Sequence, residues 1–210
     1  FDTNYTSTLT IDESIHTKLN STDLMMHYKD GSKFKVTLKD SKKKAIKNAK
    51  IKIAVNGVTY NKVTDSKGTA SINLNLNSGS YVVLTTFDGT NKFKKASVKS
   101  TVTIKSTIKC SDFTKYYKNT DSYYAKFYDN KGNPLKNTNV KIKLNGKKYT
   151  IKTNYKGLAG LAVDLKPGKY NIVPINIKTS ESITKTVTIK SLIETNDLMF
   201  NETDIGKFNV

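Results

Sequence analysis

The chain has 210 residues, and its 36 basic residues are all lysine against 17 acidic ones, for a formal net charge of +19. Such a charge is common in nucleic-acid-binding proteins, but base and phosphate recognition depends on the bidentate guanidinium of arginine, so no nucleic-acid partner is predicted. Apolar runs fall short of the roughly 18 residues of a membrane-spanning helix, and the start of the chain lacks a signal pattern.

Apolar and polar residues alternate with period two in short segments along the whole chain, and this pattern predicts strands with one buried face. The clearest segments are 34–38, 51–55, 72–76, 123–127, 140–144 and 161–165. Asn56-Gly57 and Asn145-Gly146 lie between such segments and predict type I′ hairpin turns. The best helix candidate, "DSKKKAIKNAK" from Asp40, aligns with a later segment that contains Gly132 and Pro134, so we predict loops for both.

The chain contains an internal repeat. Residues 23–84 and 112–173 align without a gap at an offset of 89, and 19 of the 62 pairs are identical. The identical positions are mainly turn and core residues, as in Gly68/Gly157 and Tyr81/Tyr170. In the second repeat we predict about seven strands, which start near 108, 122, 139, 148, 158, 169 and 183. This spacing is typical of a β-sandwich.

The two ends of the chain carry pieces of the same pattern. "TLTI" at Thr8 matches "TVTI" at Thr101 and Thr186, and "DLMFNETDIGKFNV" at Asp197 matches "DLMMHYKDGSKFKV" at Asp23. We therefore expect the last strand of a preceding repeat and a linker in 1–19, repeat 1 in 20–107, repeat 2 in 108–192, and the first strands of a following repeat in 193–210. The short connections between repeats lack a flexible composition and predict an extended array.

No residue pattern predicts catalysis, a cofactor or a metal. The two histidines, His16 and His27, have no partner that recurs in both repeats, and the recurring aspartates, Asp23/Asp112/Asp197 and Asp40/Asp129, are more simply explained as turn or strand-end caps. "TDSKG" at Thr64 resembles part of a calcium loop, but its counterpart "TNYKG" lacks the carboxylate. The complete absence of Gln excludes Cys–Gln thioester and Thr–Gln ester cross-links.

The segment "YYKNTDSYYAKFY" concentrates aromatic and basic side chains that could contact a ligand: Tyr116, Tyr117, Lys118, Tyr124 and Lys126. Core packing is the alternative for half of them, because alternate residues of a strand face inward. Three sequons make Asn4, Asn20 and Asn201 candidate glycosylation sites, although a chain this rich in Asn and Thr also produces sequons by chance. Elsewhere lysines alternate with apolar residues, as in "NVKIKLNGKKYTIKT", which is typical of a solvated strand face; a dedicated polyanion site is the second interpretation.

Residues 116–170, from "YYKNTDSYYAKFY" through "NPLKN" to "LKPGKY", resemble the immunoglobulin-like repeats of adhesin-like surface proteins of methanogenic archaea. The wider pattern is similar to bacterial invasin-type and collagen-adhesin B-type repeats. The resemblance implies an all-β fold of two tandem Ig-like seven-stranded β-sandwich domains, an extracellular location on the cell surface, and no catalytic residues.

On this basis the sequence predicts a non-enzymatic stalk that supports cell attachment. The alternative is a dedicated binding module that holds an anionic wall polymer or a host glycan through its Lys and Tyr surfaces. Partners are then envelope polymers, glycans or surface proteins of other cells, and the incomplete ends allow either a monomer or a strand-exchanged dimer.

Overall fold

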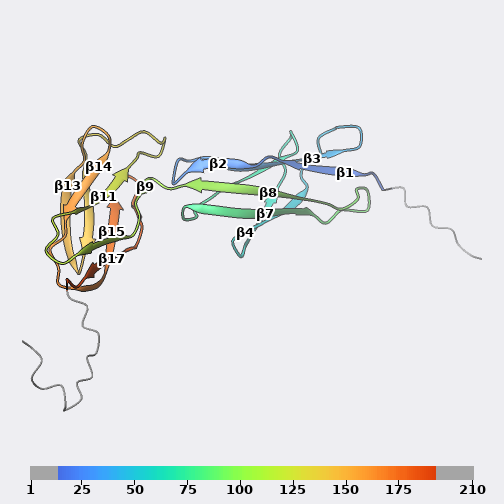
Figure 1. The fold of residues 1–210 in the computed structure, drawn as a ribbon. Coiled ribbons are helices and arrows are strands. Elements are labelled where there is room, and N and C mark those ends of the chain that lie inside the picture. Colours follow the sequence, from blue (N-terminus) through green and yellow to red (C-terminus); the bar gives the residue numbers. More distant parts are fainter. Residues whose placement is uncertain (1–13, 193–210) are drawn as a thin grey trace, which may run out of the picture. The chain divides into compact units, whose positions relative to one another are not determined.

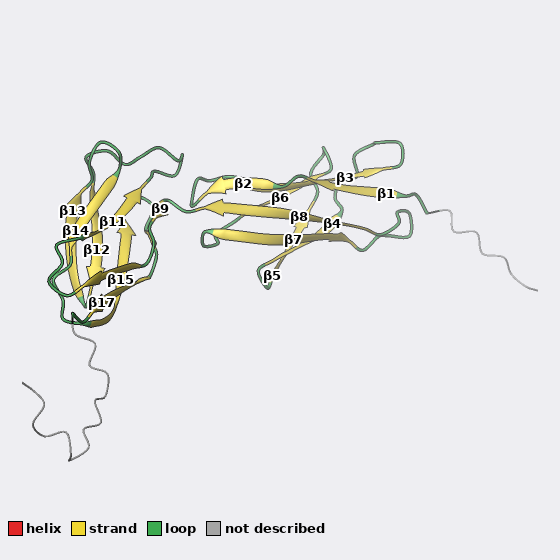
Figure 2. Ribbon diagram, in the orientation of Figure 1, coloured by secondary structure: helices red, strands yellow, loops and turns green. Residues whose placement is uncertain are grey.

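The computed structural model describes residues 14–192, and all of its regular elements are strands (Figures 1 and 2). The chain forms two compact units whose main boundary falls between Thr107 and Ile108. Each unit consists of two sheets that face each other across a hydrophobic core. The all-β sandwich prediction is therefore confirmed.

In the first unit, a three-stranded small sheet has the order β1-β3-β6 and a five-stranded large sheet has the order β2-β8-β7-β4-β5. The strands are β1 (Thr17–Ser21), β2 (Leu24–His27), β3 (Lys33–Asp40), β4 (Lys50–Val55), β5 (Val58–Val63), β6 (Thr69–Asn73), β7 (Gly79–Phe87) and β8 (Ala96–Lys105).

The second unit repeats this plan with a small sheet β14-β11-β9 and a large sheet β10-β17-β15-β12-β13, in which β16 also pairs with β15. Its strands are β9 (Ile108–Lys109), β10 (Phe113–Tyr116), β11 (Ser122–Phe127), β12 (Asn139–Leu144), β13 (Lys147–Lys152), β14 (Leu158–Ala162), β15 (Gly168–Asn176), β16 (Glu181–Ser182) and β17 (Lys185–Lys190).

In each unit the first strand changes sheets partway along its length. In the second unit, where seven strands were expected, this accounts for β10, and the two-residue β16 is the other additional strand. After β1 in the small sheet, the chain crosses to β2, which pairs in parallel with β8; β9 and β10 make the same change, and β10 pairs in parallel with β17. Where the crossing leaves a strand N–H without a strand partner, Asp23 Oδ1 accepts from Thr101 N (2.7 Å) and Asp112 Oδ1 accepts from Thr186 N (2.8 Å). These two aspartates are caps, as predicted; Asp197 lies outside the described residues.

The parallel pairing fixes where the chain enters and leaves each unit. Because the first and last strands of a unit run in the same direction side by side, the chain enters at one end of the sandwich and leaves at the other.

Alternation places the predicted apolar residues in the two cores. In β4 and β12, the residues Ile51, Ile53, Val140 and Ile142 are at most 1 % exposed, while the lysines between them face solvent. The Asn-Gly turns are confirmed as well, since Asn56 and Gly57 have φ of 48° and 76° and join the paired residues Val55 and Val58. Asn145 and Gly146 repeat this geometry.

The turn before β6 and β14 needs a glycine for two reasons. Gly68 and Gly157 have positive φ, 70° and 76°, and a Cβ on them would lie 2.5 and 2.6 Å from the carbonyl oxygens of Leu38 and Phe127. The residue that opens the turn caps it in both repeats. Asp65 Oδ1 accepts from Thr69 N at 2.9 Å, and Asn154 Oδ1 accepts from Leu158 N at 3.1 Å. The Asp-to-Asn difference therefore preserves the turn, because an amide oxygen replaces a carboxylate oxygen.

In each unit a buried threonine precedes this turn and forms hydrogen bonds with the loop that leads into β4 in the first unit and into β12 in the second. Thr64 Oγ1 donates to Ile46 O (2.7 Å) and accepts from Ala49 N (2.9 Å). Thr153 Oγ1 makes the same bonds to Leu135 O and Thr138 N. Both segments are loops, as predicted, and the Ala45-Ile46 and Pro134-Leu135 variants each bury their second residue.

A tyrosine side chain bonds to the backbone at the start of β7 and at the start of β15. The hydroxyl of Tyr81 donates to Asn77 O (2.8 Å), and that of Tyr170 donates to Lys166 O (3.0 Å). A tyrosine bonded to the backbone a few residues upstream, at the start of this strand, is a hallmark of the immunoglobulin fold. Together with the strand order, it identifies both units as Ig-like sandwiches.

The first sandwich begins earlier than the expected start at residue 20. All of β1, from Thr17, pairs with β3, and Ile15 N donates to Lys92 O at 2.8 Å. Residues 15–19 therefore belong to the first unit and not to a linker. The "TLTI" segment at Thr8 and the expected following repeat in 193–210 lie outside the described residues. Strand exchange through the ends would involve these segments and stays a prediction.

Candidate functional site

The five residues that the sequence suggests as ligand contacts are divided between the two sheets of the second unit. Tyr116 is on β10 of the large sheet, with Tyr117 and Lys118 directly after it, whereas Tyr124 and Lys126 are on β11 of the small sheet. The outer faces of the two sheets of a sandwich point away from each other. The structure therefore does not bring these residues together on one face.

The first group surrounds the end of β10. Tyr116 is 52 % exposed, and Lys190 of the neighbouring β17 places its Nζ 5.7 Å from the ring centroid. Tyr117 packs against the core, with Lys118 Nζ 5.0 Å from its ring centroid. Core packing thus explains Tyr117, and only Tyr116 offers a largely free ring.

The second group lies along β11. Tyr124 is 58 % exposed and is paired with Gly160 across the sheet, where a Cβ would lie 2.6 Å from the tyrosine ring. The ring therefore covers a glycine that has no side chain to pack. Lys126 Nζ lies 5.2 Å from the ring centroid of Tyr128.

The candidate glycosylation sites are only partly described. Asn20 is exposed on β1, where a glycan could extend into solvent. Asn4 and Asn201 lie outside the described residues.

Among residues 14–192, no group of three or more His, Cys, Asp or Glu side chains is placed to bind a metal ion. The recurring aspartates that could have formed a carboxylate site bond to backbone N–H groups instead. Asp40 Oδ1 accepts from Lys44 N (2.8 Å), and Asp129 Oδ1 accepts from Asn133 N (2.8 Å). The described part of the chain contains no helix that could cross a membrane.

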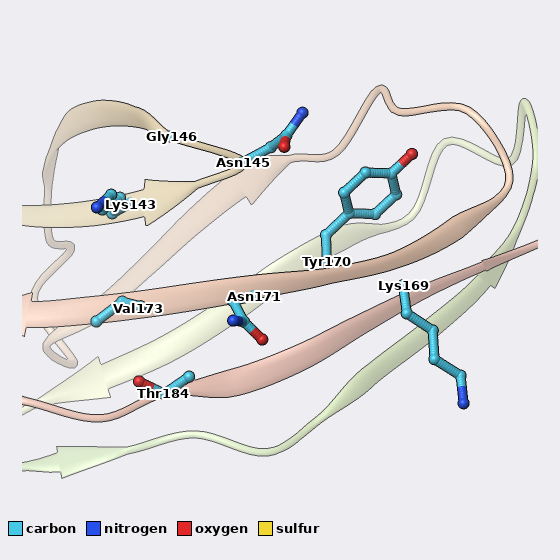
Figure 3. Close-up of a pocket in the computed structure, with 8 residues that line it drawn as sticks. All are labelled: Lys143, Asn145, Gly146, Lys169, Tyr170, Asn171, Val173 and Thr184. Carbon is cyan, nitrogen blue, oxygen red and sulfur yellow. The ribbon is translucent and has the colours of Figure 1, made fainter.

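The outer face of the large sheet of the second unit carries lysines of "NVKIKLNGKKYTIKT", for which the sequence left a solvated face and a polyanion site as the two interpretations. It contains an open cavity of about 420 Å³ at the β12–β13 turn and the start of β15 (Figure 3). Its lining is polar and cationic: Lys143, Asn145, Gly146, Lys169, Tyr170, Asn171, Val173 and Thr184. Figure 3 shows Lys143 and Lys169 at opposite ends of this group. The alternating lysines of "NVKIKLNGKKYTIKT" were the available signal, but only the strand register shows which of them share a face.

No protein-family model and no curated protein matches the sequence. Solved structures with a similar fold include trypsin-activated α-2-macroglobulin from Escherichia coli, a 1.5-MDa bacterial ice-binding adhesin and the titin Ig tandem domains A164-A165.

Their identities to this chain are 9, 15 and 11 %, and their TM-scores are 0.47, 0.33 and 0.32. The alignments cover 83, 86 and 83 % of this chain and 16, 66 and 97 % of the three structures. At this level of similarity none of them supports an argument on function. The Ig-like assignment rests on the strand order and the anchoring tyrosines described above.

Proposed function

We propose that this chain is a non-enzymatic segment of an adhesin-like protein of the cell surface, in which tandem Ig-like units act as a stalk and support attachment. The residues shared by the two repeats build the core, the turns and the caps, and this is what a structural repeat requires. The resemblance of residues 116–170 to repeats of methanogen surface proteins supports the extracellular location.

The parallel pairing of the first and last strands is the observation that carries the stalk role. The pairs are Leu24–His27 with Val102–Lys105, and Phe113–Tyr116 with Val187–Lys190. Tension on the two ends of a unit pulls these strands in opposite directions along their length. The hydrogen bonds between them are then loaded in shear, all at once, so the unit resists extension.

Single-molecule stretching of the whole chain from its two termini tests this role. We expect two separate unfolding events, each releasing about 300 Å of chain, because about 85 residues extend by up to about 3.5 Å each. A single event, or extension without measurable resistance, would exclude a load-bearing stalk.

The pulling direction provides the matched control. Thiol attachment is made at Lys147→Cys, in a Cys110→Ser background, and at the C-terminus. Lys147 is level with Ile172 through Leu144, and β17 ends beside Gly168, the end of β15 toward which the β12–β13 turn points, so both points lie toward the same end of the large sheet. The strands should then separate one hydrogen bond at a time. The unfolding force of the second unit should fall well below its value for pulling from the termini.

A dedicated binding module is the second candidate, favoured by the exposed rings of Tyr116 and Tyr124. It predicts saturable binding of an anionic wall polymer or a glycan by the chain alone. Tyr116→Ala and Tyr124→Ala, made separately, should then each weaken binding; if neither does, these tyrosines are not the contacts.

A further inference from the structure

Lysines line the outer face of the large sheet in the second unit. Strand alternation and register assign Lys141 and Lys143 of β12, Lys148 and Lys152 of β13, and Lys169 of β15 to this face, and all five are exposed. None of them forms an ion pair with a described residue. The outward positions of β10, β17, β15, β12 and β13 carry no carboxylate.

The first unit has the same backbone plan but a different surface at the same positions. At the offset of 89, Ala54, Thr59, Val63 and Ser80 replace Lys143, Lys148, Lys152 and Lys169, and only Lys52 matches a lysine, Lys141. Lys52 also forms an ion pair with Asp88 (2.7 Å), whereas Ile177 is the residue at the offset from Asp88. Folding therefore does not require lysines here, and only the second unit carries the full set.

The arrangement of these lysines opposes folding. Lys143 and Lys148 are directly opposite each other on β12 and β13, and like charges at such a pair destabilise a sheet. The corresponding pair in the first unit is Ala54 and Thr59, which carries no charge. A bound anion would neutralise this repulsion.

The lysines form a strip along the strands. Neighbouring strands lie about 4.8 Å apart and alternate residues about 7 Å apart, so the strip from Lys152 to Lys169 extends for about 27 Å along the strands. Asn145, Asn171 and Thr184 lie between the charges and line the 420 Å³ cavity (Figure 3). The surface thus alternates point charges with amide and hydroxyl groups.

This chemistry fits an anionic polysaccharide. Lysine ammonium groups are compact, hydrated point charges that pair with carboxylate or sulfate groups along a flexible polymer, and the Asn and Thr side chains can exchange hydrogen bonds with sugar hydroxyls. Nucleic acid is the less favoured ligand, because the sequence has no arginine and no aromatic residue shares the outward positions of β12, β13 and β15 with the lysines for base stacking.

We propose that the large sheet of the second unit, through Lys141, Lys143, Lys148, Lys152 and Lys169, binds an anionic polysaccharide along its strands, and that the first unit does not. The proposal deepens the attachment part of the proposed function by naming the surface and the ligand class.

Exchange of residues between the two repeats tests it. In the full chain, the loss variant carries Lys143→Ala, Lys148→Thr, Lys152→Val and Lys169→Ser, the residues of the first unit. The gain variant also carries the reverse changes, Ala54→Lys, Thr59→Lys, Val63→Lys and Ser80→Lys. Binding to immobilised polygalacturonate, dextran sulfate and neutral dextran is measured at low and moderate salt.

We expect the unaltered chain to bind at least one anionic polymer and not neutral dextran, and the loss variant to bind at least about tenfold more weakly with a smaller salt dependence. The gain variant should recover binding through its first unit. The two anionic polymers distinguish a carboxylate ligand from a sulfate ligand.

A charge-matched control separates a site from general attraction. Lys33→Ser, Lys35→Ser, Lys42→Ser and Lys67→Ser remove four exposed lysines of the first unit, away from its large sheet. An equal loss of binding in this control, no binding by the unaltered chain, or tighter binding to single-stranded DNA than to either polymer would overturn the proposal.

Circular dichroism and urea unfolding verify that each variant folds. The stalk role is judged separately, because these surface changes leave the stretching response intact.

Discussion

At the residue scale, Thr153 shows how one hydroxyl organises a loop. Replacing it with valine keeps the shape but leaves Leu135 O and Thr138 N without this partner in a buried site. We expect Thr153→Val to lower the free energy of unfolding of the second unit by about 1–3 kcal/mol, and Thr64→Val to do the same in the first. Urea unfolding measures both; the exposed Thr150→Val is the control and should stay within about 0.5 kcal/mol.

Tyr123 makes the stability of the second unit sensitive to alkaline pH. Burial, and then the adjacent Cys110, raise the pKa of its phenol above the ordinary value. Above about pH 10 the unfolded chain ionises this tyrosine while the folded chain keeps the proton, so the folded state binds more protons and its stability falls as the pH rises. The stabilisation is fully present below about pH 10.

The first unit has Phe34 at the corresponding position, which suggests the variant. In Tyr123→Phe, the urea midpoint of the second unit should fall less between pH 9 and pH 11 than in the unaltered chain. Other titrating groups, the lysines above all, are the same in both proteins and cancel in this comparison. Equal falls in the two proteins would show that Tyr123 ionises without unfolding.

At the element scale, two glycines with similar φ should respond differently to alanine. Gly146 in the β12–β13 turn has φ of 80° and open space around its missing Cβ, whereas Gly157 has φ of 76° and the carbonyl oxygen of Phe127 only 2.6 Å away. Gly146→Ala should cost about 1–2 kcal/mol, the strain of a left-handed backbone. Gly157→Ala should cost at least about 2 kcal/mol more, since the Phe127–Gly157 backbone contact must open. Similar losses would show that the turn can shift without cost.

Strand alternation was enough to predict most elements, because a strand buried on one face repeats every two residues. It was not enough for β2 and β10, whose four-residue sequences "LMMH" and "FTKY" become strands only through pairing with the distant β8 and β17. The tyrosine-rich segment was treated as one group for a related reason. Tyr116 and Tyr124 are eight residues apart, and the chain changes sheets between them.

Alternation predicted that the lysines of "NVKIKLNGKKYTIKT" face solvent, but it did not predict which lysines of different strands lie together. Lys143 and Lys148 face the same way because the Asn145-Gly146 turn sets their register, and Lys169 joins them only because β15 lies next to β12. In contrast, the caps Asp23 and Asp112 were predictable, since they recur at the repeat offset and have no recurring partner for other chemistry.

At the scale of the whole molecule, the net charge of +19 should make stability depend on salt. Raising the NaCl concentration from about 0.02 M to 0.3 M shortens the screening length from about 20 Å to about 6 Å and weakens the repulsion between lysines. We expect the melting temperature of each unit to rise by about 4–8 °C for each kcal/mol of repulsion relieved within it, as for a domain of about 85 residues. The loss variant should respond less, because it lacks the Lys143–Lys148 pair.

The opposite positions of chain entry and exit in each unit also have a genetic consequence. A DNA segment that encodes one repeat can be duplicated or deleted in frame without disturbing the strand pairing inside its neighbours, since each unit closes its own first strand against its own last strand. Recombination between such repeats would change the length of the protein in whole units. Copies could then differ in their outer surfaces while they keep the same strand order, as the two large sheets illustrate.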